Sequence, residues 1–222
     1  MENSMLNTLN LYAANAALLC VCINVLFCIV NFKKMDGPFK RLFIFLLMNF
    51  TIEILALVFI KMGMNNLPLL HIYVLAEFIL FSYFYKSIIL KPSAFQSIYW
   101  YFVIGGSVLI VLNSIFLQSI FDFNTIAKTF VQISIIGYAV VYFYNLVEDP
   151  TLSPSTSKSL RLVNSAVITY YSGSLFIFMF NGISFESENS NILFWIFNSL
   201  LNIIFHLLIL YALWRLYYKK TT

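Results

Sequence analysis

Four ionisable side chains lie inside long apolar runs of this sequence: Glu53, His71, Glu77 and His206. An ionisable group in the hydrocarbon core of a membrane is costly unless it has a partner, so each one marks a possible functional site. Glu77 carries the most information, because it lies well inside Leu69–Tyr85, an apolar run long enough to cross a membrane. A carboxyl in such a place can anchor a ligand, act as a general acid or base, or carry a proton.

The two glutamates are predicted to lie at nearly the same depth. With a helical rise of ~1.5 Å per residue, Glu53 is roughly 18 Å from Arg41, and Glu77 is roughly 12 Å from Leu69 at the opposite side of a core ~30 Å thick. A short turn joins the two segments, which favours antiparallel neighbours and allows the carboxyls to meet if both face inward. Because a low-dielectric interior disfavours two ionised carboxylates, we predict that at least one of them is protonated at neutral pH.

Other polar side chains share the predicted level of the carboxyls. Asn49 precedes Glu53 by four residues and Tyr73 precedes Glu77 by four, so each pair shares a helix face. The remaining predicted ligand contacts come from later segments: Tyr170, Asn198, Asn202 and His206. His71 is rotated by roughly 120° from Glu77 and is predicted to line the entrance instead. The alternative is that these side chains simply join helices by hydrogen bonds.

Seven apolar segments must position these residues. The chain of 222 residues is 61% hydrophobic and 10% charged, whereas soluble domains are about 25% charged, so the bilayer is its expected surrounding. We predict an all-α bundle of seven transmembrane helices forming one domain over residues 1–222. The predicted spans are about 9–32, 42–60, 69–90, 97–117, 124–147, 160–180 and 191–213. Gly105 and Gly106 in the fourth span are expected to allow close helix packing.

Basic residues predict the orientation. With the N-terminus outside, 11 of the 13 Lys and Arg residues lie on the inner side, and Lys61 and Lys128 lie on the outer side. This asymmetry follows the positive-inside rule. It predicts a multi-pass protein of the cytoplasmic (inner) membrane with a cytoplasmic C-terminus. The basic charge is therefore interpreted as membrane orientation, and no nucleic-acid partner is expected.

Several kinds of chemistry are disfavoured. No lysine lies in the middle of the seventh segment, as retinal binding by a rhodopsin would need, and two histidines on different segments cannot build a three-histidine zinc site. The chain has no GxSxG motif, phosphate loop or CxxC motif. Its cysteines, Cys20, Cys22 and Cys28, share the first segment, which excludes a disulfide framework. We expect no metal and no cofactor.

The stretch HIYVLAEF (His71–Phe78) resembles an H-x-Y-x-x-x-E-F pattern in the third helix of a family of small, uncharacterised seven-helix bacterial membrane proteins. Similar features recur at YFYNLVEDP (Tyr142–Pro150), YYSGSLFIF (Tyr170–Phe178) and FHLLILYALWR (Phe205–Arg215). The resemblance implies the seven-helix fold and a bacterial origin, and its polar positions match His71, Tyr73 and Glu77. It implies no established activity. A looser similarity to seven-helix sensor modules that accompany signalling kinases is an analogy at the level of the fold.

We therefore predict a receptor-like or sensor-like binding module with an intramembrane polar pocket centred on the two glutamates. Its ligand would be a small molecule or a lipid, and its signal would pass to a cytoplasmic partner. This prediction favours a non-catalytic role. One alternative is a lipid-directed membrane enzyme that uses the carboxyl pair as acid and base. The other is a proton-coupled small-molecule carrier.

Overall fold

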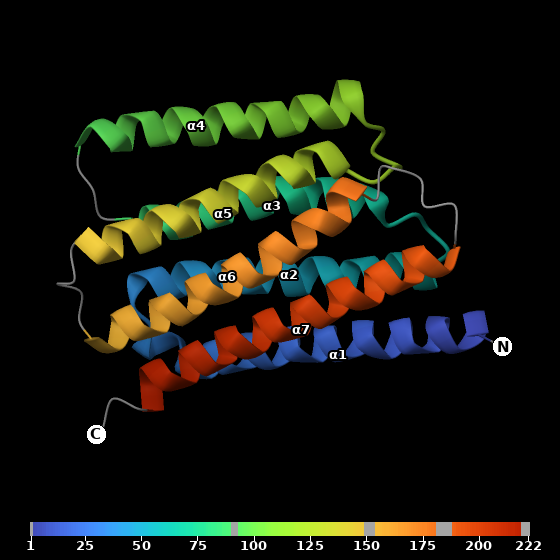
Figure 1. The fold of residues 1–222 in the computed structure, drawn as a ribbon, viewed down its shortest axis with the longest axis horizontal. Helices are drawn as coiled ribbons and strands as arrows, with labels where there is room; N and C mark the ends of the chain where they lie inside the picture. Colours follow the sequence, from blue (N-terminus) through green and yellow to red (C-terminus); the bar gives the residue numbers. More distant parts are fainter. Residues whose placement is uncertain (1, 90–92, 149–153, 181–187, 219–222) are drawn as a thin grey trace. The chain divides into compact units, whose positions relative to one another are not determined.

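The computed structural model describes residues 2–89, 93–148, 154–180 and 188–218. It is helical, and seven of its helices are long and apolar enough to cross a membrane, which confirms the predicted all-α class and the predicted number of candidate spans (Figure 1). The long helices are α1 (Glu2–Asn31), α2 (Gly37–Lys61), α3 (Leu67–Lys86), α4 (Ser93–Leu112), α5 (Thr125–Glu148), α6 (Pro154–Phe180) and α7 (Glu188–Tyr218). Two short helices accompany them: η1 (Phe32–Lys34) and η2 (Asn113–Leu117).

Local sequence explains several helix ends. Asp36 precedes α2 in an extended conformation, and α2 and α3 each have a proline in the first turn, where the missing N–H costs no hydrogen bond. Gly63 follows α2 with a φ of +68°, in the left-handed region that glycine tolerates. The third span ends earlier than predicted, at Lys86, because the chain leaves the helix in a tight turn at Ser87.

The helices group into two compact units. That residues 1–222 form one domain stays a prediction. Residues 1–34 and 149–222 form the first, called here the three-helix unit because it holds α1, α6 and α7. Residues 35–148 form the second, the four-helix unit, with α2, α3, α4 and α5. Each unit is described by itself.

In the three-helix unit, α7 packs against both α1 and α6. A Cβ atom added to Gly173 of α6 would lie 2.6 Å from a methyl carbon of Leu201, so this glycine allows α6 and α7 to approach closely. α1 begins at the end of the unit opposite to the one where α7 finishes (Figure 1). α1 and α7 therefore run in the same direction.

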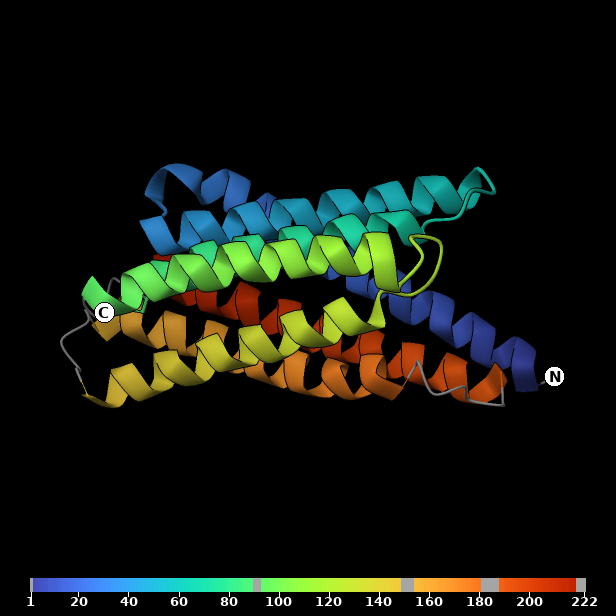
Figure 2. The same cartoon turned by 90° about the horizontal axis from the view of Figure 1, so that it is seen from above.

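In the four-helix unit, α3 is the central helix. It contacts α2, α4 and α5, which run alongside it (Figure 2). In their most apolar stretches, 44% of the residues of α3 are buried, against 17% for α2. Aromatic rings fill the core: Phe81 meets Phe45 of α2 at a centroid distance of 4.4 Å, and Phe78 meets Phe130 of α5 at 5.6 Å.

The predicted close contact of the fourth span is confirmed at one of its glycines. A Cβ atom on Gly106 would lie 2.7 Å from the ring of Phe78, whereas a Cβ atom on Gly105 would meet nothing within 4 Å. α4 then continues into η2, a π-helical turn in which the Gln118 N–H bonds the carbonyl of Asn113, five residues earlier. π-turns are rare and often lie at functional sites.

Candidate functional site

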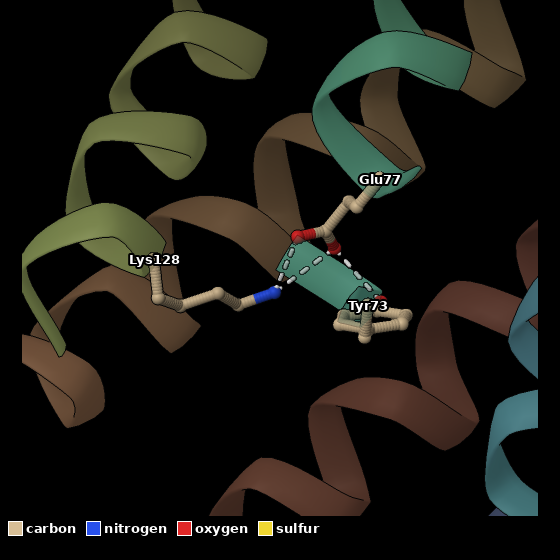
Figure 3. Close-up of polar contacts among 3 residues, drawn as sticks. All are labelled: Tyr73, Glu77 and Lys128. Atoms are coloured by element: carbon tan, nitrogen blue, oxygen red, sulfur yellow. Dashed lines mark hydrogen bonds and ion pairs between the residues drawn. The ribbon is translucent and has the colours of Figure 1, made fainter. Parts of the chain in front are cut away.

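Among the described residues of the four-helix unit, the most buried charged ones form an ion pair. Glu77 comes from α3 and is 0% exposed, and Lys128 comes from the first turn of α5 and is 1% exposed. The Lys128 Nζ atom lies 2.7 Å from Glu77 Oε2 and 2.9 Å from Oε1 (Figure 3). The two helices are thus joined by a charge-assisted contact in which the ammonium group reaches both carboxylate oxygens.

Tyr73 completes this arrangement. Its O–H donates to Glu77 Oε1 over 2.8 Å, and its ring centroid lies 4.8 Å from the Lys128 Nζ atom, within the range of a cation–π interaction. Figure 3 shows the tyrosine and the lysine approaching the carboxylate from two helices. We name Tyr73, Glu77 and Lys128 the Glu77 cluster.

Helix periodicity positions the members of the cluster. Tyr73 and Glu77 are four residues apart on α3 and therefore share a face. Lys128 is flanked at the same spacing by Asn124, which directly precedes α5, and by Gln132 of α5, both 0% exposed. α5 thus carries a buried polar stripe, and its central member contacts α3.

Burying such a pair has a large desolvation cost. Removing each ion from water costs several kcal/mol, and the mutual attraction offsets this only with good geometry and further hydrogen bonds. Here the carboxylate accepts from both the ammonium and the Tyr73 hydroxyl. The Glu77 cluster meets these conditions, and its opposite charges cancel inside the apolar core.

The structure gives the two glutamates different partners. Glu53, half-buried on α2, accepts a hydrogen bond of 3.3 Å from Asn49 Nδ2, as the predicted Asn49–Glu53 spacing requires. Glu77 is held by Lys128 and Tyr73. The charge that faces Glu77 is therefore an ammonium group and not the second carboxyl. That one of the two glutamates is protonated stays a prediction.

The other predicted ligand contacts belong to the three-helix unit. His206 is 1% exposed, and its carbonyl accepts a hydrogen bond of 2.8 Å from Asn24 Nδ2 of α1. The ring of Tyr170 packs on Phe205 at a centroid distance of 5.2 Å. Within the described residues, the Oδ1 atoms of Asn198 and Asn202 are buried without a hydrogen-bond partner.

His71 was predicted to line an entrance, and the structure gives it a buried position, 7% exposed, at the end of the four-helix unit. Its Nδ1 atom lies 2.8 Å from Ser114 Oγ of η2, and its Nε2 atom lies 3.2 Å from the carbonyl oxygen of Asp122. The imidazole therefore connects α3 to the π-helical turn and to the loop that precedes α5.

Lys128 is the residue that the sequence interpretation missed, because it was counted among the outer charges. Lys128 lies inside the apolar span Thr125–Val147 and is buried, so it is not an exposed loop charge of the kind that such a count uses. The orientation itself stays a prediction. The sequence did contain a signal for this contact, namely the depth in the span that the Lys128 ammonium group can reach. Four residues from Asn124 give a rise of about 6 Å, and the extended four-carbon stem adds about 6 Å. Together these reach the depth of roughly 12 Å predicted for Glu77.

No protein-family model, curated protein or solved structure matches this chain. The resemblance drawn from the His71–Phe78 pattern therefore stays a prediction. Among the described residues, no group of three or more His, Cys, Asp or Glu side chains could hold a metal ion. The chemistry of the site therefore depends on the three side chains of the Glu77 cluster.

Proposed function

We propose that this chain is a receptor-like or sensor-like binding module whose polar centre is the Glu77 cluster rather than a pair of glutamates. The observation that carries the proposal is the buried ion pair between α3 and α5. Intramembrane charges that pair with each other commonly mark ligand or ion sites.

Helix packing alone does not require this pair. α3 already contacts α5 through aromatic rings, Phe78 with Phe130 and Tyr85 with Tyr138, at centroid distances of 5.6 and 5.5 Å. Replacing a buried ion pair by apolar side chains is often neutral or stabilising. A pair that adds little to stability is better explained by a binding role, in which each charge exchanges its present partner for a group of a ligand.

The cluster offers a carboxylate and an ammonium group side by side. A zwitterionic ligand would match both: its cationic group would pair with Glu77, and its anionic group with Lys128. Free amino acids and the ethanolamine headgroup of lipids have this chemistry. Binding would exchange the internal ion pair for two ligand contacts, and would thereby loosen the contact between α3 and α5.

In the proposed orientation, the N-terminus of the chain lies outside the cytoplasmic membrane of a bacterium. With Lys128 buried in α5, Lys61 is the one basic residue left on the proposed outer side, which sharpens the charge asymmetry. The signal would leave through the basic inner segments to a cytoplasmic partner. The parallel course of α1 and α7 fits termini on opposite sides of the membrane (Figure 1).

A proton-coupled carrier is the second candidate, and the same ion pair favours it. A proton taken up by Glu77 would release Lys128, which is the exchange that a carrier needs. The lipid-directed enzyme has less support, because a carboxyl pair acting as acid and base requires two carboxyls at one substrate. Here Glu53 is hydrogen-bonded to Asn49, and Glu77 to Tyr73 and Lys128.

The test measures ligand-induced stabilisation of the purified full chain in lipid nanodiscs. The probes are glycine, other free amino acids and short-chain phosphatidylethanolamine. A ligand at about 100 times its Kd stabilises the folded state by about 2.7 kcal/mol, which raises the unfolding temperature. The double variant Glu77→Met with Lys128→Met keeps the side-chain volumes and removes both charges, so it should fold and lose the response. An equal response in both proteins, or none in the wild type, would contradict the proposal.

A further inference from the structure

The hydrogen bonds of His71 can be assigned proton by proton. The Asp122 carbonyl only accepts, so the His71 Nε2 atom, 3.2 Å away, must carry a hydrogen. In the neutral imidazole Nδ1 then has no hydrogen, and it accepts from the Ser114 hydroxyl at 2.8 Å. The geometry thus fixes one tautomer of the neutral ring.

The same atoms also satisfy the charged ring. A protonated imidazole has a hydrogen on Nδ1, which would point at Ser114 Oγ and require the serine to act as acceptor. The serine hydroxyl has a second acceptor available, since its Oγ lies 3.2 Å from the carbonyl oxygen of Ile110. Turning one hydroxyl hydrogen from His71 to Ile110 therefore accommodates the extra proton without moving a heavy atom.

His71 is one of three side chains that bond backbone carbonyls of the loop before α5. The carbonyls of Phe121, Asp122 and Phe123 accept from Asn65, His71 and Gln118, over distances of 3.4, 3.2 and 3.2 Å. Asn65 and Gln118 are neutral amides at every pH. Only the contact from His71 can change its charge, and a charge-assisted hydrogen bond is roughly twice as strong as a neutral one.

We propose that His71 is a proton-binding site, and that its protonation tightens the loop 118–124 on α3 and the π-helical turn. Histidine is the side chain whose charge ordinarily changes between about pH 5 and 8. The site goes beyond the proposed ligand site, since it uses another side chain and takes another ligand, the proton.

Charged groups lie on the loop, on α3 itself and on two helices that pack against it, of which α2 carries Glu53 and Lys61. The loop contributes Asp122, whose exposed carboxylate belongs to the residue that accepts from the ring. α3 itself carries Tyr73 and Glu77, the latter about 9 Å further along the helix axis, and α5 contributes Lys128, which compensates Glu77. η2 presents the neutral Ser114.

The first test uses nitrogen-15 NMR of labelled histidine side chains. The chain has two histidines, so the variant His206→Gln leaves the signals of His71 alone. At pH 8 we expect the neutral ring with its hydrogen on Nε2, and on acidification toward pH 5 a ring with hydrogens on both nitrogens. A neutral ring with its hydrogen on Nδ1, or a ring that stays neutral throughout, would overturn the proposal.

The second test measures amide hydrogen exchange in the loop 118–124, corrected for the intrinsic pH dependence of exchange. In the wild type, exchange should slow on the order of fivefold on acidification, because charge assistance roughly doubles the strength of one hydrogen bond. His71→Gln should abolish this slowing, and His206→Gln, which lies in the other unit, should keep it. Equal slowing of amide exchange in all three proteins, or no slowing in the wild type, would overturn the proposal that protonation of His71 tightens the loop. The double variant of Glu77 and Lys128 should keep the response of His71, which separates this proposal from the ligand site.

Discussion

A double-mutant cycle on the Glu77–Lys128 pair tests the central feature of the structure. The single changes are Glu77→Gln and Lys128→Met, and the third protein carries both. At the observed 2.7 Å, an effective dielectric constant of about 20 gives an attraction of about 6 kcal/mol, which sets an upper limit for the coupling. Because part of this attraction offsets desolvation, we expect a coupling energy of about 3–5 kcal/mol.

Each single variant should lower the free energy of unfolding by about 3 kcal/mol, because it leaves one buried charge without its counterion. The double variant should recover most of the loss. It keeps an oxygen at position 77 for the Tyr73 hydroxyl and leaves no charge unpaired.

The assay is reversible unfolding of the purified protein by SDS titration, followed by circular dichroism. Lys61→Met is the matched control, since Lys61 is exposed at the end of α2 and its loss should change stability by less than about 0.5 kcal/mol. A coupling energy below about 1 kcal/mol would refute the reasoning. It would mean that water reaches the two charges and that they behave like a surface pair.

Two further predictions concern single side chains. Tyr73→Phe removes the hydroxyl that donates to Glu77 and keeps the ring beside the ammonium group, so the free energy of unfolding should fall by about 1.5–3 kcal/mol, measured in the same titration. A loss of free energy of unfolding below about 0.5 kcal/mol, the size expected for a surface substitution, would show that water replaces the hydroxyl as donor to Glu77. Gly106→Ala should destabilise by about 1–3 kcal/mol because the new methyl group meets the ring of Phe78. Gly105→Ala, its neighbour with open space, should be neutral or stabilising, and equal effects at both positions would contradict the packing of α4 on α3.

Much of the fold could be predicted because it depends on local quantities. Span number follows from apolar length, helix starts follow from residues such as Pro38 and Pro68, and the tight contact at Gly106 follows from its missing side chain. The end of the third span was misplaced. Apolar residues continue past Lys86, and hydropathy does not register the turn at Ser87.

The partner of Glu77 could not be read from local pattern in the same way. Periodicity assigns Tyr73 and Glu77 to one face of α3, but it does not say which neighbouring helix that face meets. Pairing by chain order suggested α2 and its Glu53. In the structure α5 supplies the partner, and Lys128 was assigned to the outer side by a charge count that ignores how far a lysine stem reaches.

α3 is divided along its length into two parts with different physical roles. Its second half buries Phe78, Phe81 and Phe84, each 0% exposed, and these rings fix the helix against its neighbours by non-directional apolar contact. The part of α3 that runs up to Glu77 carries His71, Tyr73 and Glu77, whose contacts are directional and depend on charge. A change of partner at these polar groups therefore costs the unit little of its packing. If the two proposals hold, one end of α3 responds to a ligand or a proton while the aromatic contacts of the other end keep the fold.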